Sequence, residues 1–422
     1  MKEEKLGPQR KTRIVSWAVF LVTLILVLIS LIPVVFPALL LKTFGGFEDH
    51  IGINPFEIGI WAAPFLITNL VLLCLGIFYL KNILPKQIVN SIKFIFNFEV
   101  PSSVAFLVIT ILLGFYILSS VNELSDEFYL PDYNVRVKSW IENYSITEVG
   151  NWGLGNHLNI FLLSSSTEIF GNDKVIPYIA SIALLLLTYL TTFEITKKRF
   201  AGIVALVIVL QSGIFLMYDT SVSYPNFWVV FYLLSIYLIY KKTPVTVLAY
   251  AASLLSKAIT VLYLPMTIFF IYRAKMKNAK KIRLLIYYVV FMAIIVIFLS
   301  VSDVSLFGRD LGEEIGSKYV RGEFSSHDFW GGFGALHSSL RLDGLLLVFL
   351  LPLIVGLFIA SRKGIEQADA ILFFLMSILI SAPFIQGFSD FINTPYRFIP
   401  LVVFFAIGVG VLVSKRPRVA SE

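Results

Sequence analysis

Charge and cysteine are both scarce in this chain. Charged residues make up 14% of its 422 residues, where ordinary soluble domains have ~25%. The one cysteine, Cys74, excludes an intrachain disulfide framework, and its place in a long apolar run does not suit a thiol active site. Hydrophobic residues reach 58%. This composition excludes a soluble domain and predicts an integral membrane protein whose helices cross a hydrocarbon core of ~30 Å.

Apolar segments recur along almost the whole sequence, which predicts an all-α, polytopic helical membrane protein with about twelve transmembrane helices. The segments are 14–41, 56–80, 101–120, 174–194, 201–218, 223–240, 244–256, 258–273, 283–301, 342–361, 367–386 and 392–413. The pair 244–256 and 258–273 is short and broken at Ser256-Lys257. It forms either a re-entrant hairpin or two thin, tilted crossings.

The distribution of basic residues predicts the orientation. Most of the 34 lysines and arginines fall on the side of the N-terminus when the segments alternate across the membrane. We therefore expect a multi-pass protein of the cell membrane with cytoplasmic N- and C-termini and an extracytoplasmic active face. The net charge of +7 then reflects topology and attraction to anionic lipid headgroups, and it does not indicate nucleic-acid binding.

Two predicted outer loops, 121–173 and 302–341, are longer than a connection requires. In the first, residues 158–170 are predicted to form a short amphipathic helix at the interface, ended by Gly171. The second contains the run Trp330-Gly331-Gly332-Phe333-Gly334, which suits a flap that orders on a sugar. Its His327, Asp328 and His337 match no strong metal-ligand spacing, so a solvated loop is the default interpretation of these residues.

An ordered set of residues spans the region 101–413. The set consists of Asp126-Glu127-Phe128-Tyr129, Trp140, Asn156-His157, Phe170-Gly171, Tyr218 to Pro225, Leu254 to Lys257 and Pro395-Tyr396-Arg397-Phe398-Ile399-Pro400. It resembles the polytopic glycosyltransferases of the GT-C fold, and more narrowly the protein-mannosyltransferase and aminoarabinose-transferase branch. The resemblance implies a catalytic domain over 101–413, with N-terminal spans 1–100 of unknown role before it and a cytoplasmic tail 414–422 after it.

The chain departs from this family at two points. Leu158-Asn159 stands where members often have Pro-Pro, and Tyr178 or its neighbours stand where an arginine is frequent early in the next span. These departures concern the substrate pocket more than the fold.

The resemblance implies roles for the first outer loop. Asp126 would be the general base, and Glu127 an orienting carboxylate or a metal ligand. His157 would bind phosphate or share a divalent cation, Mg or Mn, with Asp126 and Glu127. The competing interpretations are that the carboxylates cap an interfacial turn and that His157 caps the helix that follows it.

Five further positions are candidates for substrate binding. Lys257 would neutralise the carrier phosphate or extend to the interface. Arg397, beside Tyr396, would hold a phosphate or anchor the chain among lipid headgroups. Asp219, beside Tyr224, would be a second carboxylate on the acceptor side or the N-cap of the next span.

The predicted function is that of a membrane glycosyltransferase. It would move a sugar, with inversion, from a polyprenyl-phosphate donor to a lipid, glycan or protein acceptor in the cell envelope. Two alternatives stay open: a polysaccharide polymerase or ligase that uses a polyprenyl-linked donor, and a multi-span secondary transporter. A transporter, however, has ionisable residues near the midplane, whereas here they lie mostly at the predicted outer ends.

Overall fold

The computed structural model describes residues 8–39, 54, 56–125, 133–145, 154–241, 244–274, 276–301, 323–388 and 395–414. These residues form helices and connecting turns, and none of them belongs to a β-strand. The predicted all-α class is therefore confirmed. Eight helices in these ranges are long and apolar enough to cross a membrane: Ile14–Val35, Ala62–Tyr79, Ser102–Ser125, Val175–Thr196, Asn278–Val301, Gly344–Arg362, Gln367–Phe388 and Pro395–Ser414.

The other four predicted spans are helical but short. Segment 201–218 is divided into α11 (Arg199–Leu210) and α12 (Gly213–Tyr218), because Ser212 caps α12 by accepting a hydrogen bond from the backbone N–H of Phe215. The remaining three form α13 (Phe227–Lys241), α14 (Val245–Ser256) and α15 (Leu264–Arg273). A helix of twelve residues measures about 18 Å, so twelve full crossings stay a prediction.

The chain forms two compact units. One unit comprises Met1–Glu99 with Glu323–Glu422, and the other comprises Val100–Gly322. The first boundary lies beside the predicted one at residue 100, whereas the predicted domain 101–413 contains residues of both units. We call them the discontinuous unit and the central unit.

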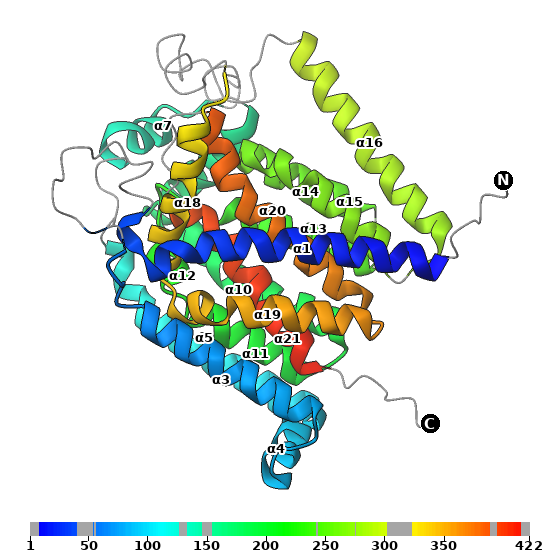
Figure 1. Cartoon of the computed structure of the whole chain (residues 1–422). Helices are drawn as coiled ribbons and strands as arrows, with labels where there is room; N and C mark the ends of the chain where they lie inside the picture. The colour runs from blue at the N-terminus through cyan, green and yellow to red at the C-terminus, as the bar shows by residue number, and fades with distance from the viewer. Residues whose placement is uncertain are drawn as a thin grey trace. The chain divides into compact units, whose positions relative to one another are not determined.

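The discontinuous unit is built from α1 (Pro8–Val35), α3 (Ala62–Leu80), α4 (Lys86–Asn97), α18 (Ser326–Leu340), α19 (Gly344–Arg362), α20 (Glu366–Phe388) and α21 (Ile399–Ser414). Helix α1 contacts α18, α19 and α20, and α21 contacts α19 and α20 (Figure 1). The stacked rings of Phe374 and Phe404, with centroids 4.0 Å apart, join α20 to α21. The N-terminal segment is therefore part of a packed helical core.

Helix α18 corrects the prediction of a glycine-rich flap. The run from Trp330 to Gly334 is helical and packs against α20. A Cβ added at Gly332 would lie 2.5 Å from the Cα of Pro383, so this glycine permits a close approach of two helices. His327 and Asp328 begin the same helix, and the side chain of His337 lies outside the described residues.

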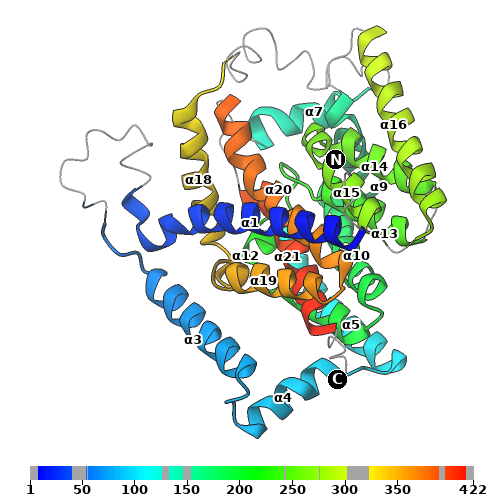
Figure 2. The ribbon, with the colours of Figure 1, turned by 45° about the vertical axis from the view of Figure 1, so that its right-hand side comes forward.

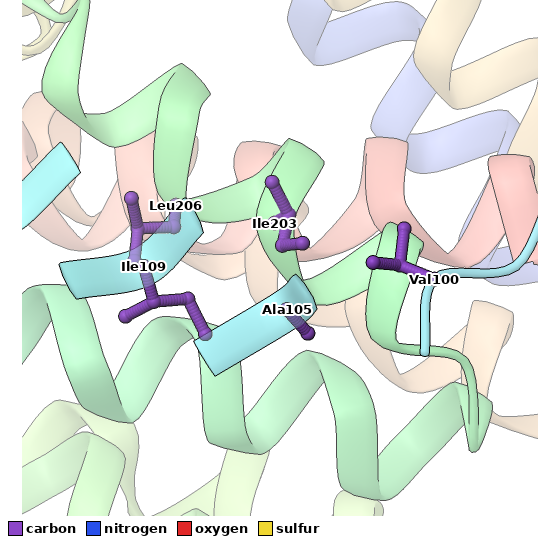
Figure 3. Close-up of a cluster of buried hydrophobic side chains, with 5 residues drawn as sticks. All are labelled: Val100, Ala105, Ile109, Ile203 and Leu206. Atoms are coloured by element: carbon purple, nitrogen blue, oxygen red, sulfur yellow. The ribbon is translucent and has the colours of Figure 1, made fainter. Parts of the chain in front are cut away.

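The central unit is organised around α10 (Val175–Thr196), which contacts α9 (His157–Phe170), α11 and α13. Helix α5 (Ser102–Ser120) packs on α11 through Ala105, Ile109 and Leu206, which Figure 3 shows close together. Helix α13 pairs with α14, and α16 (Asn278–Val301) contacts α14 and α15. Aliphatic side chains at helical spacing thus pack together and form the hydrophobic core of the central unit.

Two local predictions of helix ends are confirmed, whereas the position of segment 158–170 at the membrane interface stays a prediction. Helix α9 covers the predicted segment 158–170 and ends at Gly171, whose left-handed backbone conformation (φ 65°) favours glycine. Helix α14 ends at Ser256, and Lys257 is extended before a 3₁₀ turn over Ala258–Tyr263. Whether this broken pair crosses the membrane twice or turns back stays a prediction.

Candidate functional site

The predicted acidic pair itself, Asp126 and Glu127, lies outside the described residues. Of the other predicted site residues, His157, Asp219, Tyr224 and Lys257 belong to the central unit, and Tyr396 and Arg397 belong to the discontinuous unit. The candidate site therefore consists of described residues around His157, Asp219, Lys257 and Arg397.

Both flanks of the acidic segment are held by the turn that follows α9. Asn172 donates from Nδ2 to the carbonyl of Leu124 at 3.1 Å, and Lys174 donates from Nζ to the carbonyl of Glu123 at 2.8 Å. On the other flank, the hydroxyl of Tyr133 donates to Asp173 Oδ2 at 2.7 Å. The backbone just before Asp126 and the side chain of Tyr133 are thus held by three successive polar residues.

Asp219 lies at the centre of a buried polar cluster beside this segment. Its Oδ2 accepts hydrogen bonds from Tyr116 at 2.8 Å and from Ser120 at 3.4 Å, and its backbone carbonyl accepts one from Ser181 at 2.6 Å. The side chain is 1% exposed, and its Oδ1 has no hydrogen-bond partner among the described residues. A buried carboxylate oxygen left in this state is costly unless a proton or a ligand compensates for it.

Burial raises the pKa of the Asp219 carboxyl to about 7, although the hydrogen bond from Tyr116 favours the ionised form. The nearby carboxylate of Glu123 raises the pKa further, and the nearby backbone N–H of Thr220 and the hydrogen bond from Ser120 oppose this. Asp219 therefore exchanges a proton near neutral pH. The interpretation of Asp219 as the N-cap of the next span is wrong, because the residue ends α12 and α13 begins only at Phe227.

Sequence reasoning missed most members of this cluster. Tyr116 and Ser120 are four residues apart on α5 and so share one helical face. Asn226 donates to Ser181 at 3.0 Å, and its fully buried Oδ1 has no partner within the described part of the chain. The helical spacing of the Tyr–Ser pair was a usable signal, whereas the contribution of Asn226 depends on how α13 packs against α10.

Tyr224 lies next to this cluster and is half-buried. Its ring meets Tyr218 edge to face, with centroids 5.8 Å apart, and its backbone N–H donates to Ser221 Oγ. Asn226 in turn donates to the carbonyl of Tyr218 at 3.4 Å. Tyr224 therefore packs against Tyr218, the residue that precedes Asp219, and its role in substrate binding stays a prediction.

A second candidate region lies where the start of α9 contacts the segment that follows α14, and it includes His157 and Lys257. A Cβ added at Gly155 would lie 2.6 Å from the Cβ of Ala258 and 2.9 Å from its backbone N. Gly155 therefore permits the backbone before His157 to approach the backbone that follows Lys257. The backbone segments next to two predicted phosphate-binding positions, His157 and Lys257, are therefore close together, although 100 residues separate the two positions in the sequence.

His157 is held at the start of α9 by Tyr144, whose hydroxyl lies 3.2 Å from His157 Nε2. Its Nδ1 is buried and makes no hydrogen bond to any described residue. Burial lowers the pKa of His157, so the ring is neutral at pH 7. The N-terminus of α9 favours negative charge, and a neutral His157 can serve there only as a hydrogen-bond partner. The helix cap is Asn156, which forms no capping bond with its side chain.

Tyr396 and Arg397 form a 3₁₀ turn, Pro395–Phe398, that opens α21. The Tyr396 side chain is 4% exposed, and Arg397 Nε donates to its hydroxyl at 3.4 Å. A tyrosine packed inside the unit does not suit an anchor among lipid headgroups, so that interpretation is not favoured. The phosphate-binding role of Arg397 stays a prediction.

An open apolar pocket of about 170 Å³ lies between α9, α10 and α13. Its lining consists of Leu162, Ile176, Ile179, Ala180, Ala183, Phe227, Val230 and Phe231. Leu162 is five residues, or about 7 Å along the helix axis, from His157 on the same helix. The hollow is open and wholly apolar, and it lies on a different face of α9 from His157.

The described residues contain no group of three His, Cys, Asp or Glu side chains that could hold a metal ion. Of the predicted set Asp126, Glu127 and His157, only His157 is among them. The predicted Mg or Mn site therefore stays a prediction.

Comparison with known proteins gave no match: no family model, no curated protein and no solved structure matches the chain. The functional assignment therefore depends on the residues and their contacts.

Proposed function

We propose that the protein is a membrane glycosyltransferase of the GT-C type, similar to the protein-mannosyltransferase and aminoarabinose-transferase branch. It transfers one sugar from a polyprenyl-phosphate donor to a lipid, glycan or protein acceptor on the extracytoplasmic side. In this proposal the chain crosses the cell membrane about twelve times and has both termini in the cytoplasm.

The observation that carries the proposal is the close approach of Gly155 to Ala258. It supports a phosphate site made of the α9 N-terminus, the neutral ring of His157 and the ammonium of Lys257. Backbone N–H groups at a helix N-terminus and a lysine are a common combination for phosphate. Without this contact, His157 and Lys257 would be unrelated residues on different helices.

The apolar pocket supports the lipid nature of the donor. A polyprenyl phosphate carries its negative charge at one end of a long hydrocarbon chain, and α9 has a candidate phosphate site at its first residue and an apolar pocket at Leu162. A water-soluble nucleotide sugar would not need such a pocket. The open apolar hollow agrees with a lipid-linked donor.

The reaction is a direct displacement. The acceptor oxygen forms a bond to the anomeric carbon while the bond from that carbon to the phosphate oxygen breaks, and the electron pair leaves with the phosphate. The acceptor proton passes to Asp126, and the configuration is inverted. Asp219 is a positioning residue in this proposal, because Tyr116 and Ser120 connect it to the end of α5 that leads into the acidic segment.

The first experiment measures release of sugar from a panel of polyprenyl-phosphate sugars by the purified wild-type protein and its Asp126→Asn variant. Turnover should fall by ~10²- to 10⁴-fold in the variant, as is typical when a general base is lost. Glu142→Gln, an exposed carboxylate in the same loop, is the matched control and should keep wild-type turnover. Turnover of Asp126→Asn within a few-fold of wild type would contradict the assignment of the base.

The second experiment tests the phosphate site by titrating the protein with a fluorescent polyprenyl-phosphate sugar. Gly155→Ala and Lys257→Ala should each weaken donor binding by about tenfold, because the first separates the two segments and the second removes a charge-assisted contact. Gly114→Ala is the control, since a Cβ there meets no atom within 4 Å. Unchanged donor binding in both test variants would rule out the proposed phosphate site.

A further inference from the structure

Helix α4 has no part in the proposed reaction and has no side chain in a buried position. It follows α3 directly in the discontinuous unit and, in Figures 1 and 2, turns away from the end of α3. Both α3 and the next long apolar helix, α5, are candidate membrane spans. At twelve residues, or about 18 Å, α4 cannot cross a hydrocarbon core of ~30 Å. The helix therefore lies at one face of the membrane.

Apart from Phe94, which lies on the polar side and is 65% exposed, the sequence of α4 divides into two faces. At 100° per residue, the apolar side chains of Ile88, Val89, Ile92, Ile95 and Phe96 lie on one side of the helix. The opposite side carries Lys86, Asn90, Lys93 and Asn97, with Gln87 and Ser91 toward one edge. Such a division is typical of a helix that lies in the plane of an interface.

The packing of the unit covers this apolar face only in part. Helix α4 contacts α21, and Val89, Ile92 and Phe96 are half-buried. Ile88 and Ile95 are 41% and 47% exposed. Ile88 and Ile95 thus present exposed apolar surface along one side of the helix.

The positive charge around α4 indicates which partner contacts Ile88 and Ile95. Residues 81–98 contain Lys81, Lys86 and Lys93 and no acidic residue. The lysines are exposed, and their stems can extend along the helix while the ammonium groups reach headgroup phosphates. We propose that α4 docks on the membrane surface, with its apolar face among the acyl chains and its lysines on anionic phospholipid headgroups.

This inference is independent of the proposed function and would hold for a transporter as well. Docking of α4 would hold the end of α3 at a fixed depth and would anchor the discontinuous unit to one leaflet. It also gives the N-terminal segment, for which the sequence indicates no chemistry, a physical role.

The test uses the full chain in vesicles of phosphatidylcholine with or without phosphatidylglycerol. Cys74 is changed to Ser, and a single cysteine is placed at Ile95 on the apolar face or, as the matched control, at Asn90 on the polar face. Each variant carries an environment-sensitive fluorophore, which is quenched either by brominated phosphatidylcholine or by aqueous iodide. Near-wild-type elution in size-exclusion chromatography checks that each variant is folded.

The label at residue 95 should be quenched by brominated lipid and protected from iodide, and the label at residue 90 should show the reverse. Lys86→Gln and Lys93→Gln should each weaken the phosphatidylglycerol-dependent part of docking by about fivefold, which corresponds to ~1 kcal/mol per lysine near an anionic surface. Equal iodide quenching at both positions would overturn the proposal. Protection from iodide at residue 95 without quenching by brominated lipid would also overturn it, because a protein surface such as a second copy would then cover α4.

Discussion

Asp369 in the discontinuous unit and Asp219 in the central unit are both almost fully buried, and the two sites differ in the hydrogen bonds that the carboxylate accepts. Asp369 in α20 is fully buried and accepts a hydrogen bond from Ser16 Oγ at 2.6 Å, while Ser361 Oγ lies 2.7 Å from the same hydroxyl. Asp219 is equally buried but keeps one oxygen without a partner among the described residues, and burial raises its pKa to about 7. Burial alone therefore does not identify a chemically active carboxylate.

The partners explain the difference. The hydroxyl of Ser16 connects α1 to α20 and α19, and Asp369 lies near the N-terminus of α20, where the helix dipole favours a carboxylate. Asp219 faces a second carboxylate, Glu123, and lies in a connection between helices. One aspartate holds helices together, while the other is poised to exchange a proton.

The largest difference between the Asp219 and Asp369 sites should be in the pH dependence of the free energy of unfolding, which Asp219 should cause. Its pKa is raised from an ordinary value near 3.8 to about 7, so the folded state binds a proton that the unfolded state has lost. The free energy of unfolding should therefore fall as pH rises from about 4 to 7, by up to ~1.4 kcal/mol per pH unit, and then level off.

Asp219→Asn keeps the shape of the side chain and removes the titration. Unfolding in detergent, followed by circular dichroism at several pH values, should show a much flatter profile for this variant and greater stability at neutral pH. Asp369→Asn serves as the control and should retain the slope that Asp219 causes. An unchanged slope in Asp219→Asn would mean that another group is responsible.

Removal of the carboxylate in the discontinuous unit should have the next largest effect. Asp369→Ala leaves the buried hydroxyl of Ser16 with a poorer set of partners, and we expect a loss of ~1 to 3 kcal/mol in the free energy of unfolding. Sugar-transfer turnover of the folded fraction should stay within a few-fold of wild type. A large loss of turnover without loss of stability would show that Asp369 has a functional role.

A smaller effect is expected from Tyr116→Phe. The change removes the hydrogen bond at 2.8 Å that favours the ionised form of Asp219, so the pKa of Asp219 should rise further. The level region of the stability profile should then begin at higher pH than in the wild type. A shift toward lower pH would contradict the assigned hydrogen bond.

The smallest effect should come from Ser16→Ala, which deletes one hydroxyl between three helices. Its loss should reduce the free energy of unfolding by about 1 kcal/mol. In the double variant with Asp369→Ala, the combined loss should be less than additive, because both changes remove the same hydrogen bond. Full additivity in thermal unfolding would mean that the two side chains act separately.

The sequence by itself determined the class of the protein and the position of most helices. Long apolar runs must satisfy their backbone hydrogen bonds internally, so composition is enough to predict an all-α membrane protein. Local rules were also enough for the end of α9 at Gly171 and for the break at Ser256-Lys257, because each depends on a few neighbouring residues.

Only the tertiary structure decided which polar groups meet. The approach of Gly155 to Ala258, the bond from Tyr116 to Asp219 and the packing of Gly332 on Pro383 join residues that lie far apart in the chain. The sequence also predicted a flap at Trp330 and an N-cap at Asp219, because glycines and an isolated aspartate have these roles most often. In both places the packing of one helix on another outweighed the local preference, since burial of whole helical faces contributes more free energy than a single turn or cap.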